Sequence, residues 1–547
     1  MKSINIHIIY SALALSSGLL LSAAWPAGGF FFLLFIALVP LLILENHLSH
    51  NITIKRKGLG VFLYSYLTFF TWNLLTTWWI VNATFFGAVM AFIFNSLFMT
   101  LVFLLFHHTK MILGMKKGFV ALIVYWISFE YLHHQWDLTW PWLTFGNGFA
   151  ASIKVVQWYE YTGVYGGTLW VWLSNMLVFY AVKKPGDRYV DENGAIVSYP
   201  VLYRIGRAVA ALTVIFFPII ISHFIYSSYS ESSDPVDVVV VQPNIDPYTE
   251  KFNELPAEIQ ISKILRLANT LVDSNTRFVV APETAIPDAV WDHDLPENAS
   301  VKLLWNTMQQ HPQLNLIIGL SYIKSYMTDG PPTTTARKFK LSEGYYDMFN
   351  AAMFIDNNGA IQLYNKSKLV PGVEKMPYPA IFGFLEDFSI DLGGASGSLG
   401  SQDERAVFYT SASEAIAPSI CYESIYGEFM SEYVANGAEA IFIITNDGWW
   451  ADTPGYRQHM HYARLRAVEN RRSIARSANT GISCFINQRG DITQKTSWWV
   501  EDVLKETINL NKELTFYTRH GDYIARISIF LSVIMILYFL VRRYTIK

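Results

Sequence analysis

The sequence predicts a protein of two parts, a bundle of membrane-spanning helices and an α/β domain outside the membrane. Its 547 residues are 52% hydrophobic and only 16% charged, against about 25% charged residues in a typical soluble domain. Long apolar runs fill the first 227 residues and recur after residue 520, whereas short β-rich and helical stretches alternate over 228–520. We therefore expect a membrane domain over 1–227, an α/β domain over 228–520, and a last membrane helix with a cytoplasmic tail over 521–547.

Eight segments are apolar over roughly the 20 residues that a membrane-spanning helix needs. They cover residues 6–22, 29–45, 60–80, 85–106, 118–133, 165–182, 208–227 and 524–541. A signal peptide is the alternative interpretation of the first segment, because it is short and follows Lys2. We favour a membrane helix there, since a second apolar segment follows almost at once and no small-residue cleavage site separates the two.

Basic residues mark one side of the membrane. They gather in every second loop and after the last apolar segment, as Lys55, Arg56, Lys57, Lys110, Lys116, Lys117, Lys183, Lys184, Arg188, Arg204, Arg207, Arg542, Arg543 and Lys547. The other loops are nearly free of them, with Lys154 as the exception. Because loops rich in lysine and arginine stay in the cytoplasm, both termini are predicted to be cytoplasmic and residues 228–520 to lie on the opposite side.

The loop near 135–164 lies on the same side as the α/β domain and is rich in aromatic residues. These are Trp136, Trp140, Trp142, Phe145, Trp158, Tyr159 and Tyr161. Such a cluster is typical of the aromatic belt at a membrane surface. A wall for a lipid acyl chain is the second interpretation, and the two are compatible.

The segment 228–520 has the alternating pattern of a layered α/β domain. Apolar β-rich runs predict strands at 236–241, 277–281, 314–320, 348–355, 361–365, 440–445 and 483–486, and helices are expected near 256–273 and 456–472. The sequence DNNG at 356–359 separates two of these strands, and an Asn-Gly step in that position is typical of a hairpin turn.

Cys421 stands where a nucleophile would be displayed. It follows the apolar run 417–420 and precedes a helical stretch toward Gly437, so a strand, a cysteine and a helix succeed one another. The only other cysteine, Cys484, lies within the apolar run 482–486 and is interpreted as core. We expect two free thiols, because one disulfide would be no framework and would consume the nucleophile.

Glu283 and Lys366 each follow a predicted strand, and they supply what a thiol nucleophile needs. A carboxylate takes the proton of the thiol, and an ammonium stabilises the oxyanion of an acyl intermediate. Each residue alone has an ordinary structural explanation. The three together, each at a strand end, predict a catalytic triad.

Other classes of site find little support. His459 and His461 are two residues apart on a predicted helix and so do not share a face, and no metal-ligand spacing emerges. The net charge of −3 gives no indication of a nucleic-acid partner. We therefore expect neither a metal nor a cofactor.

The order Glu–Lys–Cys in an α/β domain resembles the nitrilase, or carbon–nitrogen hydrolase, superfamily. Seven predicted spans before this domain and one after it resemble the membrane-bound branch of that superfamily, the apolipoprotein N-acyltransferases of Gram-negative inner membranes. The matching motifs are WPWL at 140–143, WYEYTGVYGG at 158–167, VQPNI at 241–245, PET at 282–284, YNKSKLVP at 364–371, CYE at 421–423, NDGW at 446–449, RLRAVE at 464–469 and NTG at 479–481.

The resemblance implies an αββα sandwich and a role for each matching residue. Glu283 corresponds to the general base, Lys366 to the lysine that stabilises the oxyanion, and Cys421 to the nucleophile. Supporting residues of the active site are implied at Glu374, Tyr422 and Glu423.

The chain departs from the family pattern in three loops. Gly372-Val373-Glu374 stands where the family has Phe-Gly-Glu, and Gly448 stands where the family has alanine. Phe252 takes the place of a tryptophan in a mobile arm. We expect Phe252, Trp142 and Trp449 to contact lipid or to form part of a lid.

The implied activity is a two-step acyl transfer in the inner membrane, with the catalytic domain in the periplasm. Cys421 would take the sn-1 acyl chain of a phospholipid, phosphatidylethanolamine being the expected donor, as a thioester. The α-amino group of the N-terminal diacylglyceryl-cysteine of an apolipoprotein would then accept it. The partners are these two lipid substrates, and the protein is expected to act as a monomer. Two alternatives remain, a membrane-tethered amidase or nitrilase with a soluble substrate, and a transporter or receptor with an inactive appended domain.

Overall fold

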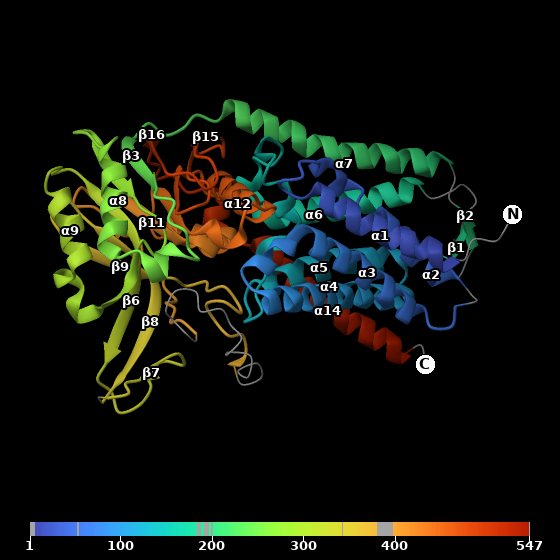
Figure 1. Cartoon of the computed structure of the whole chain (residues 1–547). Coiled ribbons are helices and arrows are strands. Elements are labelled where there is room, and N and C mark those ends of the chain that lie inside the picture. Colours follow the sequence, from blue (N-terminus) through green and yellow to red (C-terminus); the bar gives the residue numbers. More distant parts are fainter. Residues whose placement is uncertain are drawn as a thin grey trace. The chain divides into compact units, whose positions relative to one another are not determined.

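The computed structural model describes residues 6–51, 54–182, 188–190, 196–198, 201–341, 343–379 and 398–545. The chain folds into two compact units (Figure 1). The first comprises Met1–Trp78, Ala88–Ser228 and Asp522–Lys547, and the second comprises Trp79–Gly87 and Tyr229–Gly521.

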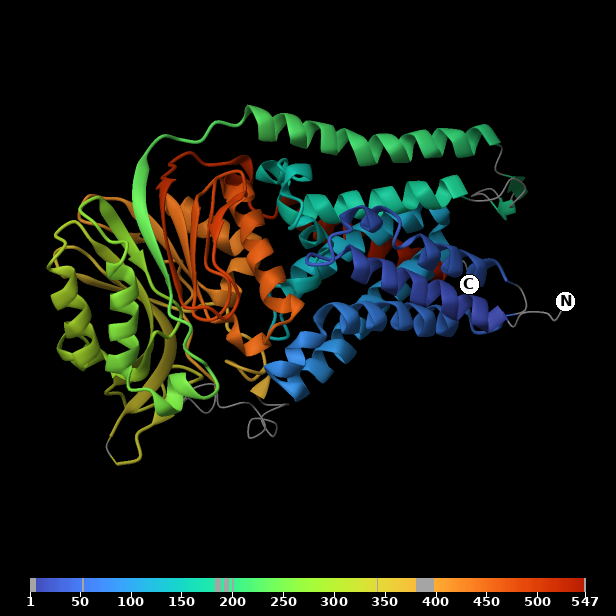
Figure 2. The ribbon, with the colours of Figure 1, turned by 45° about the horizontal axis from the view of Figure 1, so that its top comes forward.

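The first unit is helical. Its long helices are α1 (Ile6–Ala24), α2 (Val39–His50), α3 (Lys57–Thr77), α4 (Phe85–Leu113), α5 (Met115–His133), α6 (Tyr159–Val182), α7 (Val201–Ser228) and α14 (Tyr523–Thr545). Helix α7 lies alongside α6, as Figures 1 and 2 both show, and α14 packs against α5. Each of the eight apolar segments predicted from the sequence therefore contains helix.

Six helical segments of the described residues are long and apolar enough to cross a membrane. They are Ile6–Ala24, Phe31–His50, Lys57–Asn82, Phe85–Leu113, Leu202–Ser228 and Tyr523–Thr545. Helices α5 and α6 occupy the two remaining predicted positions and are not among these six. Three charged residues lie in α5, at Lys116, Lys117 and Glu130, and α6 departs from helical geometry at Gly163. Helices in a membrane domain are thus confirmed, whereas the number of eight spans stays a prediction.

Most of the aromatic loop between α5 and α6 packs inside the first unit. It forms three short 3₁₀ helices, η3 (Pro141–Leu143), η4 (Phe145–Phe149) and η5 (Ile153–Val155). The ring of Trp142 is buried and stacks on Trp140 with 5.7 Å between centroids. Phe145 stacks on Trp126 of α5 at 5.0 Å. Trp136 and Tyr161 keep more than a third of their surface exposed, so only part of the cluster is free to meet lipid.

The second unit contains two β-sheets. The eight-stranded sheet has the order β16-β3-β4-β6-β8-β7, with β5 paired to β6 and β9 paired to β8. Its strands are β3 (Pro235–Gln242), β4 (Thr276–Val280), β5 (Ile286–Trp291), β6 (Asn315–Tyr326), β7 (Arg337–Lys338), β8 (Tyr345–Ile355), β9 (Ile361–Asn365) and β16 (Asp502–Asn509). Strands β8 and β9 form the predicted hairpin, and Gly359 takes a φ of +85° in its turn.

The six-stranded sheet has the order β10-β11-β12-β13-β14-β15. Its strands are β10 (Phe408–Tyr409), β11 (Ala415–Ile420), β12 (Ala440–Thr445), β13 (Ile474–Ala478), β14 (Cys484–Ile486) and β15 (Ile492–Lys495). The three central strands β11, β12 and β13 are parallel to one another. Their carboxyl ends therefore meet at one edge of the sheet.

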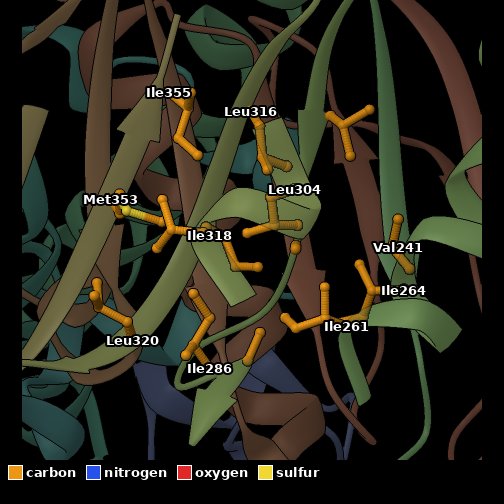
Figure 3. Packing of buried hydrophobic residues seen from close by; sticks show 14 of the residues in the cluster. Val241, Ile261, Ile264, Ile286, Leu304, Leu316, Ile318, Leu320, Met353 and Ile355 are labelled. Atoms are coloured by element: carbon orange, nitrogen blue, oxygen red, sulfur yellow. The ribbon is translucent and has the colours of Figure 1, made fainter. Parts of the chain in front are cut away.

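A core of alternating side chains joins the eight-stranded sheet to the helices α8 (Ala257–Asn269) and α9 (Ala299–Met308) (Figure 3). Because neighbouring residues of a strand point to opposite faces, every second residue of β6 faces these helices, as Leu316, Ile318 and Leu320 do. Ile261 and Ile264 of α8 meet them. Each such side chain contributes about 1.5–3 kcal/mol when fully buried.

The opposite face of this sheet packs against the six-stranded sheet. Phe278 of β4 meets Phe442 of β12 with 5.3 Å between ring centroids, and Phe354 of β8 stacks near Phe408 of β10 at 5.5 Å. The six-stranded sheet carries α11 (Gly427–Ala435) and α12 (Pro454–Asn470), and a short α13 (Phe516–His520) follows β16. The layers are helix, sheet, sheet, helix (Figure 2). This is the αββα sandwich that the resemblance implied.

Candidate active site

Cys421 lies on a strained turn at the carboxyl end of β11. It is the first residue of the 3₁₀ helix η9 (Cys421–Ile425), and its φ is +50°. This left-handed region is unfavourable for residues other than glycine, and such strain persists only where surrounding contacts hold it. The strand, cysteine and helix thus succeed one another as the sequence indicated. The residue is buried, with 8% of its surface exposed.

Glu283 and Lys366 meet at the rim of the other sheet. Glu283 lies three residues beyond β4, and Lys366 directly follows β9. The Lys366 Nζ atom is 3.1 Å from Oε1 of Glu283, and both side chains are buried. The two predicted charged groups therefore form one ion pair, although 83 residues separate them in the chain.

Glu374 completes the charged cluster. Its Oε1 atom lies 2.8 Å from Lys366 Nζ, and its Oε2 accepts a hydrogen bond of 2.8 Å from the backbone N–H of Val370. The ammonium thus stands between two carboxylates. The loop from Pro371 to Glu374 departs from the family sequence, yet its carboxylate lies beside Lys366.

Asn350 links the two carboxylates and was not predicted. Its Nδ2 atom donates to Oε1 of Glu283 at 2.7 Å and to Oε1 of Glu374 at 3.0 Å. Its backbone carbonyl accepts from Lys366 N at 2.8 Å, because β8 and β9 are neighbours. A single asparagine inside a predicted strand gives no sequence signal of such a role. Only the pairing of β8 with β9 reveals it.

The charges of the cluster set the protonation states. Burial raises the pKa of Glu283, but the Lys366 charge and the hydrogen bonds from Asn350 and Lys366 outweigh it, so the pKa is below the ordinary value. Burial lowers the pKa of Lys366, but Glu283 and Glu374 outweigh it and the pKa is well above its ordinary value. The pKa of the Cys421 thiol is raised by burial and by Glu283. The resting site therefore holds a carboxylate, an ammonium and a protonated thiol.

A second buried lysine approaches Glu283 from the segment after β3. The Lys251 Nζ atom donates to the backbone carbonyl of Glu283 at 2.8 Å. Burial lowers the pKa of Lys251 to about 7 against the opposing effect of Glu283.

Phe252, the neighbour of Lys251, stacks on Trp449 with 6.3 Å between centroids and 14° between planes. Two of the three predicted lipid or lid residues thus touch each other, whereas Trp142 lies in the first unit.

Glu423 connects the two strand ends that bear Cys421 and Lys366. Its Oε2 accepts from the N–H of Ile420 at 2.8 Å, and its Oε1 accepts from Ser367 N at 2.7 Å and Tyr364 Oη at 2.6 Å. The side chain therefore holds the nucleophile turn against the lysine turn. Both of its carboxylate oxygens therefore accept hydrogen bonds, from residues beside Cys421 and beside Lys366.

Tyr422 and Cys484 complete the predicted residues. Tyr422 is buried, and its ring packs edge-on against Tyr426 at 5.4 Å. Cys484 is a buried free thiol in β14, opposite Arg476 of β13 and Lys495 of β15.

The structure brings Glu283, Lys366, Glu374 and Cys421 into one cluster and leaves Cys484 inside the sheet. No group of three or more metal-binding side chains occurs in the described ranges of the chain.

The chain matches known families along most of its length. The family model for carbon–nitrogen hydrolases matches residues 238–513, and the model for the apolipoprotein N-acyltransferase N-terminal domain matches residues 17–177. The first spans the two sheets and Glu283, Lys366 and Cys421. The second covers helices of the first unit.

Relatives of the whole chain carry one name. An apolipoprotein N-acyltransferase of Chlorobaculum tepidum is 31% identical over 97% of this chain and 96% of the relative. One from Geobacter metallireducens is 26% identical over 94% of this chain and 92% of the relative. Among solved structures, Nit3 of Saccharomyces cerevisiae, from branch 10 of the nitrilase superfamily, is 16% identical with a TM-score of 0.36 over 53% of this chain and 97% of that chain. With a relative of 31% identity that aligns from end to end, the chain belongs to the apolipoprotein N-acyltransferase family.

Proposed function

We propose that the protein transfers the sn-1 acyl chain of a phospholipid to the α-amino group of the N-terminal diacylglyceryl-cysteine of apolipoproteins. The observation that carries this proposal is the match of both parts of the chain, helical and α/β, to one enzyme family. The charged cluster around Cys421 supports it with the chemistry that an acyl transfer requires.

In the first step Glu283 removes the proton of the Cys421 thiol, and the thiolate attacks the carbonyl carbon of the sn-1 ester. Lys366, held 3.1 Å from Glu283, stabilises the oxyanion of the tetrahedral intermediate. The intermediate collapses and expels the glycerol oxygen, which takes the proton from Glu283. A lysophospholipid leaves, and a thioester remains on Cys421.

In the second step the α-amino group of the diacylated acceptor attacks the thioester. Glu283 takes a proton from this amine, and the Cys421 thiolate leaves as the amide forms. The thiol then recovers its proton from Glu283, so the triad returns to its starting state. The raised pKa of the thiol suits this cycle, because the base and not the bulk solvent controls when the thiolate forms.

The membrane domain over 1–227 and the last helix after residue 521 give the reaction its setting. Both substrates are anchored in a bilayer, so an enzyme in the same membrane gains proximity without diffusion through water. We assign the protein to the inner membrane of a Gram-negative cell, with the catalytic domain over 228–520 in the periplasm, phosphatidylethanolamine as the donor, and a monomer as the working form.

This topology has a direct test. Alkaline phosphatase folds only on the periplasmic side, so a fusion after Ser232 is expected to be active. A fusion after Asp187, which lies outside the described residues, is expected to be inactive. The reverse pattern would overturn the topology and, with it, access to apolipoproteins.

The transfer itself is tested with a phospholipid that carries a labelled sn-1 chain and a synthetic diacylated lipopeptide. Purified protein in detergent is expected to move the label to the lipopeptide amine. A lipopeptide whose amine is acetylated is the control and should remain unlabelled. The tethered amidase predicts instead no label on the lipopeptide and hydrolysis of soluble amides, and that result would contradict the proposal.

A further inference from the structure

A fully buried polar cluster lies directly behind the Cys421 turn. It consists of Asp447, His459 and Arg476, none of which exposes any surface. They come from three elements that meet at the carboxyl edge of the six-stranded sheet: the turn after β12, helix α12 and strand β13. None of the three reaches the charged cluster of Glu283 and Lys366 through a described ion pair, so the mechanism above does not use them.

His459 binds the backbone of the nucleophile. Its Nε2 atom lies 3.0 Å from the carbonyl oxygen of Cys421 and 3.1 Å from Oγ of Ser424. A carbonyl oxygen only accepts, so Nε2 carries the hydrogen and donates it. The Ser424 hydroxyl donates to the same carbonyl at 2.8 Å. Two donors thus hold the peptide group that follows the strained φ of Cys421.

Asp447 and Arg476 fix the orientation of the imidazole. Oδ1 of Asp447 lies 3.0 Å from Nδ1 of His459, while Oδ2 forms an ion pair of 2.7 Å with Arg476. Burial raises the pKa of Asp447, but Arg476 and His459 outweigh it and lower the pKa to about 2. The carboxylate is therefore charged and holds the ring from the side away from Cys421.

Thr445 extends the network. Its hydroxyl donates to Oδ1 of Asp447 at 2.9 Å. Asp447 itself is held in a tight site, because a Cβ atom on Gly481 would approach its Oδ2 to 2.5 Å. The cluster therefore contacts Cys421 at its backbone carbonyl, through His459.

A buried ion pair seldom adds net stability, because both ions lose their hydration. A strained residue at a functional site, by contrast, needs surroundings that determine its conformation. We propose that His459, oriented by Asp447 and Arg476, is a positioning residue that fixes the Cys421 turn and so aims the thiol between Glu283 and the ester. This inference rests on the proposed acyl transfer and adds a residue to it.

Two substitutions of His459 separate its hydrogen bond to the Cys421 carbonyl from its contact with Asp447. His459→Gln places an amide nitrogen near the site of Nε2 and keeps a donor for the Cys421 carbonyl. His459→Asn places its shorter amide near the site of Nδ1. It therefore keeps a partner for Asp447 but has no donor for the Cys421 carbonyl. We expect His459→Asn to lower the single-turnover rate of thioester formation by about 10²-fold, the loss typical of a misplaced reacting atom. His459→Gln should retain most of the rate, and the phospholipid concentration for half-maximal rate should change in neither.

The matched control is His461→Gln, a histidine two residues along α12 that makes no described contact with Cys421. It should acylate at the wild-type rate. Ser424→Ala removes the second donor to the Cys421 carbonyl and should lower the acylation rate by about tenfold. This milder variant keeps the test open if His459→Asn does not fold, which thermal unfolding will reveal.

Alkylation of Cys421 by iodoacetamide separates this inference from the proposed function, because it needs no lipid. If wild-type protein forms no thioester, the proposed function fails, whereas alkylation still tests the position of the thiol. We expect slower alkylation in His459→Asn and near-normal alkylation in His459→Gln. Two outcomes would overturn the positioning role. One is an equal loss of rate in both His459 variants with a matching loss of thermal stability. The other is a wild-type rate in both His459→Asn and Ser424→Ala.

Discussion

The two sheets of the catalytic domain contribute to the site in different ways. The eight-stranded sheet supplies ionised groups, with Glu283 and Lys366 joined at 3.1 Å and braced by Asn350. The six-stranded sheet supplies a protonated thiol on the strained turn at Cys421, and the ion pair of Asp447 and Arg476 is buried behind that turn. The ion pair of Glu283 and Lys366, which we propose acts on the substrate, thus lies on a different sheet from the ion pair of Asp447 and Arg476, which we propose orients His459 behind the nucleophile. The candidate site is therefore assembled only where the two sheets face each other.

The largest effect should distinguish the two thiols of the six-stranded sheet. Cys421→Ala is expected to abolish thioester formation and complementation of a strain that lacks this activity, because no nucleophile remains. Cys484→Ala should leave both nearly intact, since that thiol lies inside β14 between neighbouring strands. Radiolabelled phospholipid detects the acyl-enzyme. A folded Cys484→Ala protein without activity would remove Cys421 from the nucleophile role.

The next largest effect on the rate of thioester formation is expected at the two carboxylates that flank Lys366. Glu283→Gln is expected to slow thioester formation by about 10²–10⁴-fold, the contribution of a general base. Glu374→Gln should still acylate, slowly, and then turn over poorly, because its carboxylate organises the loop after Val370. Single-turnover acylation separates the steps, and pre-acylated Glu374→Gln with a lipopeptide isolates the second. Fast acylation in Glu283→Gln would assign the base elsewhere.

Gly319 gives a test that removes no polar group from the site. A Cβ atom at this position in β6 would lie 2.6 Å from Cα of Glu283 and 2.4 Å from the backbone N of Thr284. Gly319→Ala must therefore displace the base, and we expect about 10²-fold slower acylation. Gly330→Ala meets open space and is the matched control. An unchanged rate in Gly319→Ala would show that the position of Glu283 tolerates movement.

The smallest effect concerns Asn350. Asn350→Ala removes one donor from each of the carboxylates Glu283 and Glu374. Hydrogen bonds to charged groups are worth about 1.5–3 kcal/mol, and Lys366 still pairs with both carboxylates, so we expect a loss near the lower end, roughly tenfold in acylation. The pKa of Glu283 should rise, because a bond that favours its charged form is gone. A wild-type rate and pH profile would limit Asn350 to a structural role.

Much of the fold could be predicted because the signals are local. The strand ending before Cys421, the hairpin turn at Gly359 and the helix at 456–472 are each encoded within a short window, and the structure confirms them. The number of membrane spans stays a prediction, because α5 carries Lys116, Lys117 and Glu130 in a segment that is otherwise apolar. Local apolarity alone does not distinguish a buried helix of a bundle from a lipid-facing one.

The site could be predicted only where a motif marks it. Glu283, Lys366 and Cys421 follow strands and match a family pattern, so the sequence predicts them as the triad, and their catalytic roles stay a prediction. Asn350 and Gly319 lie inside strands without any local signal, and their roles arise from the pairing of β8 with β9 and from close backbone packing. His459 lies on the predicted helix near 456–472, but no local signal in the sequence marks its role. Its contact with the Cys421 carbonyl depends on where α12 packs.

The most direct test of the central claim is the intact mass of purified protein after incubation with a phosphatidylethanolamine of defined chain length. We predict a single added acyl group that hydroxylamine removes, and peptide mapping should locate it on Cys421. Protein without phospholipid should show the unmodified mass. The absence of an adduct in folded protein, or an adduct on any residue other than Cys421, would contradict the account.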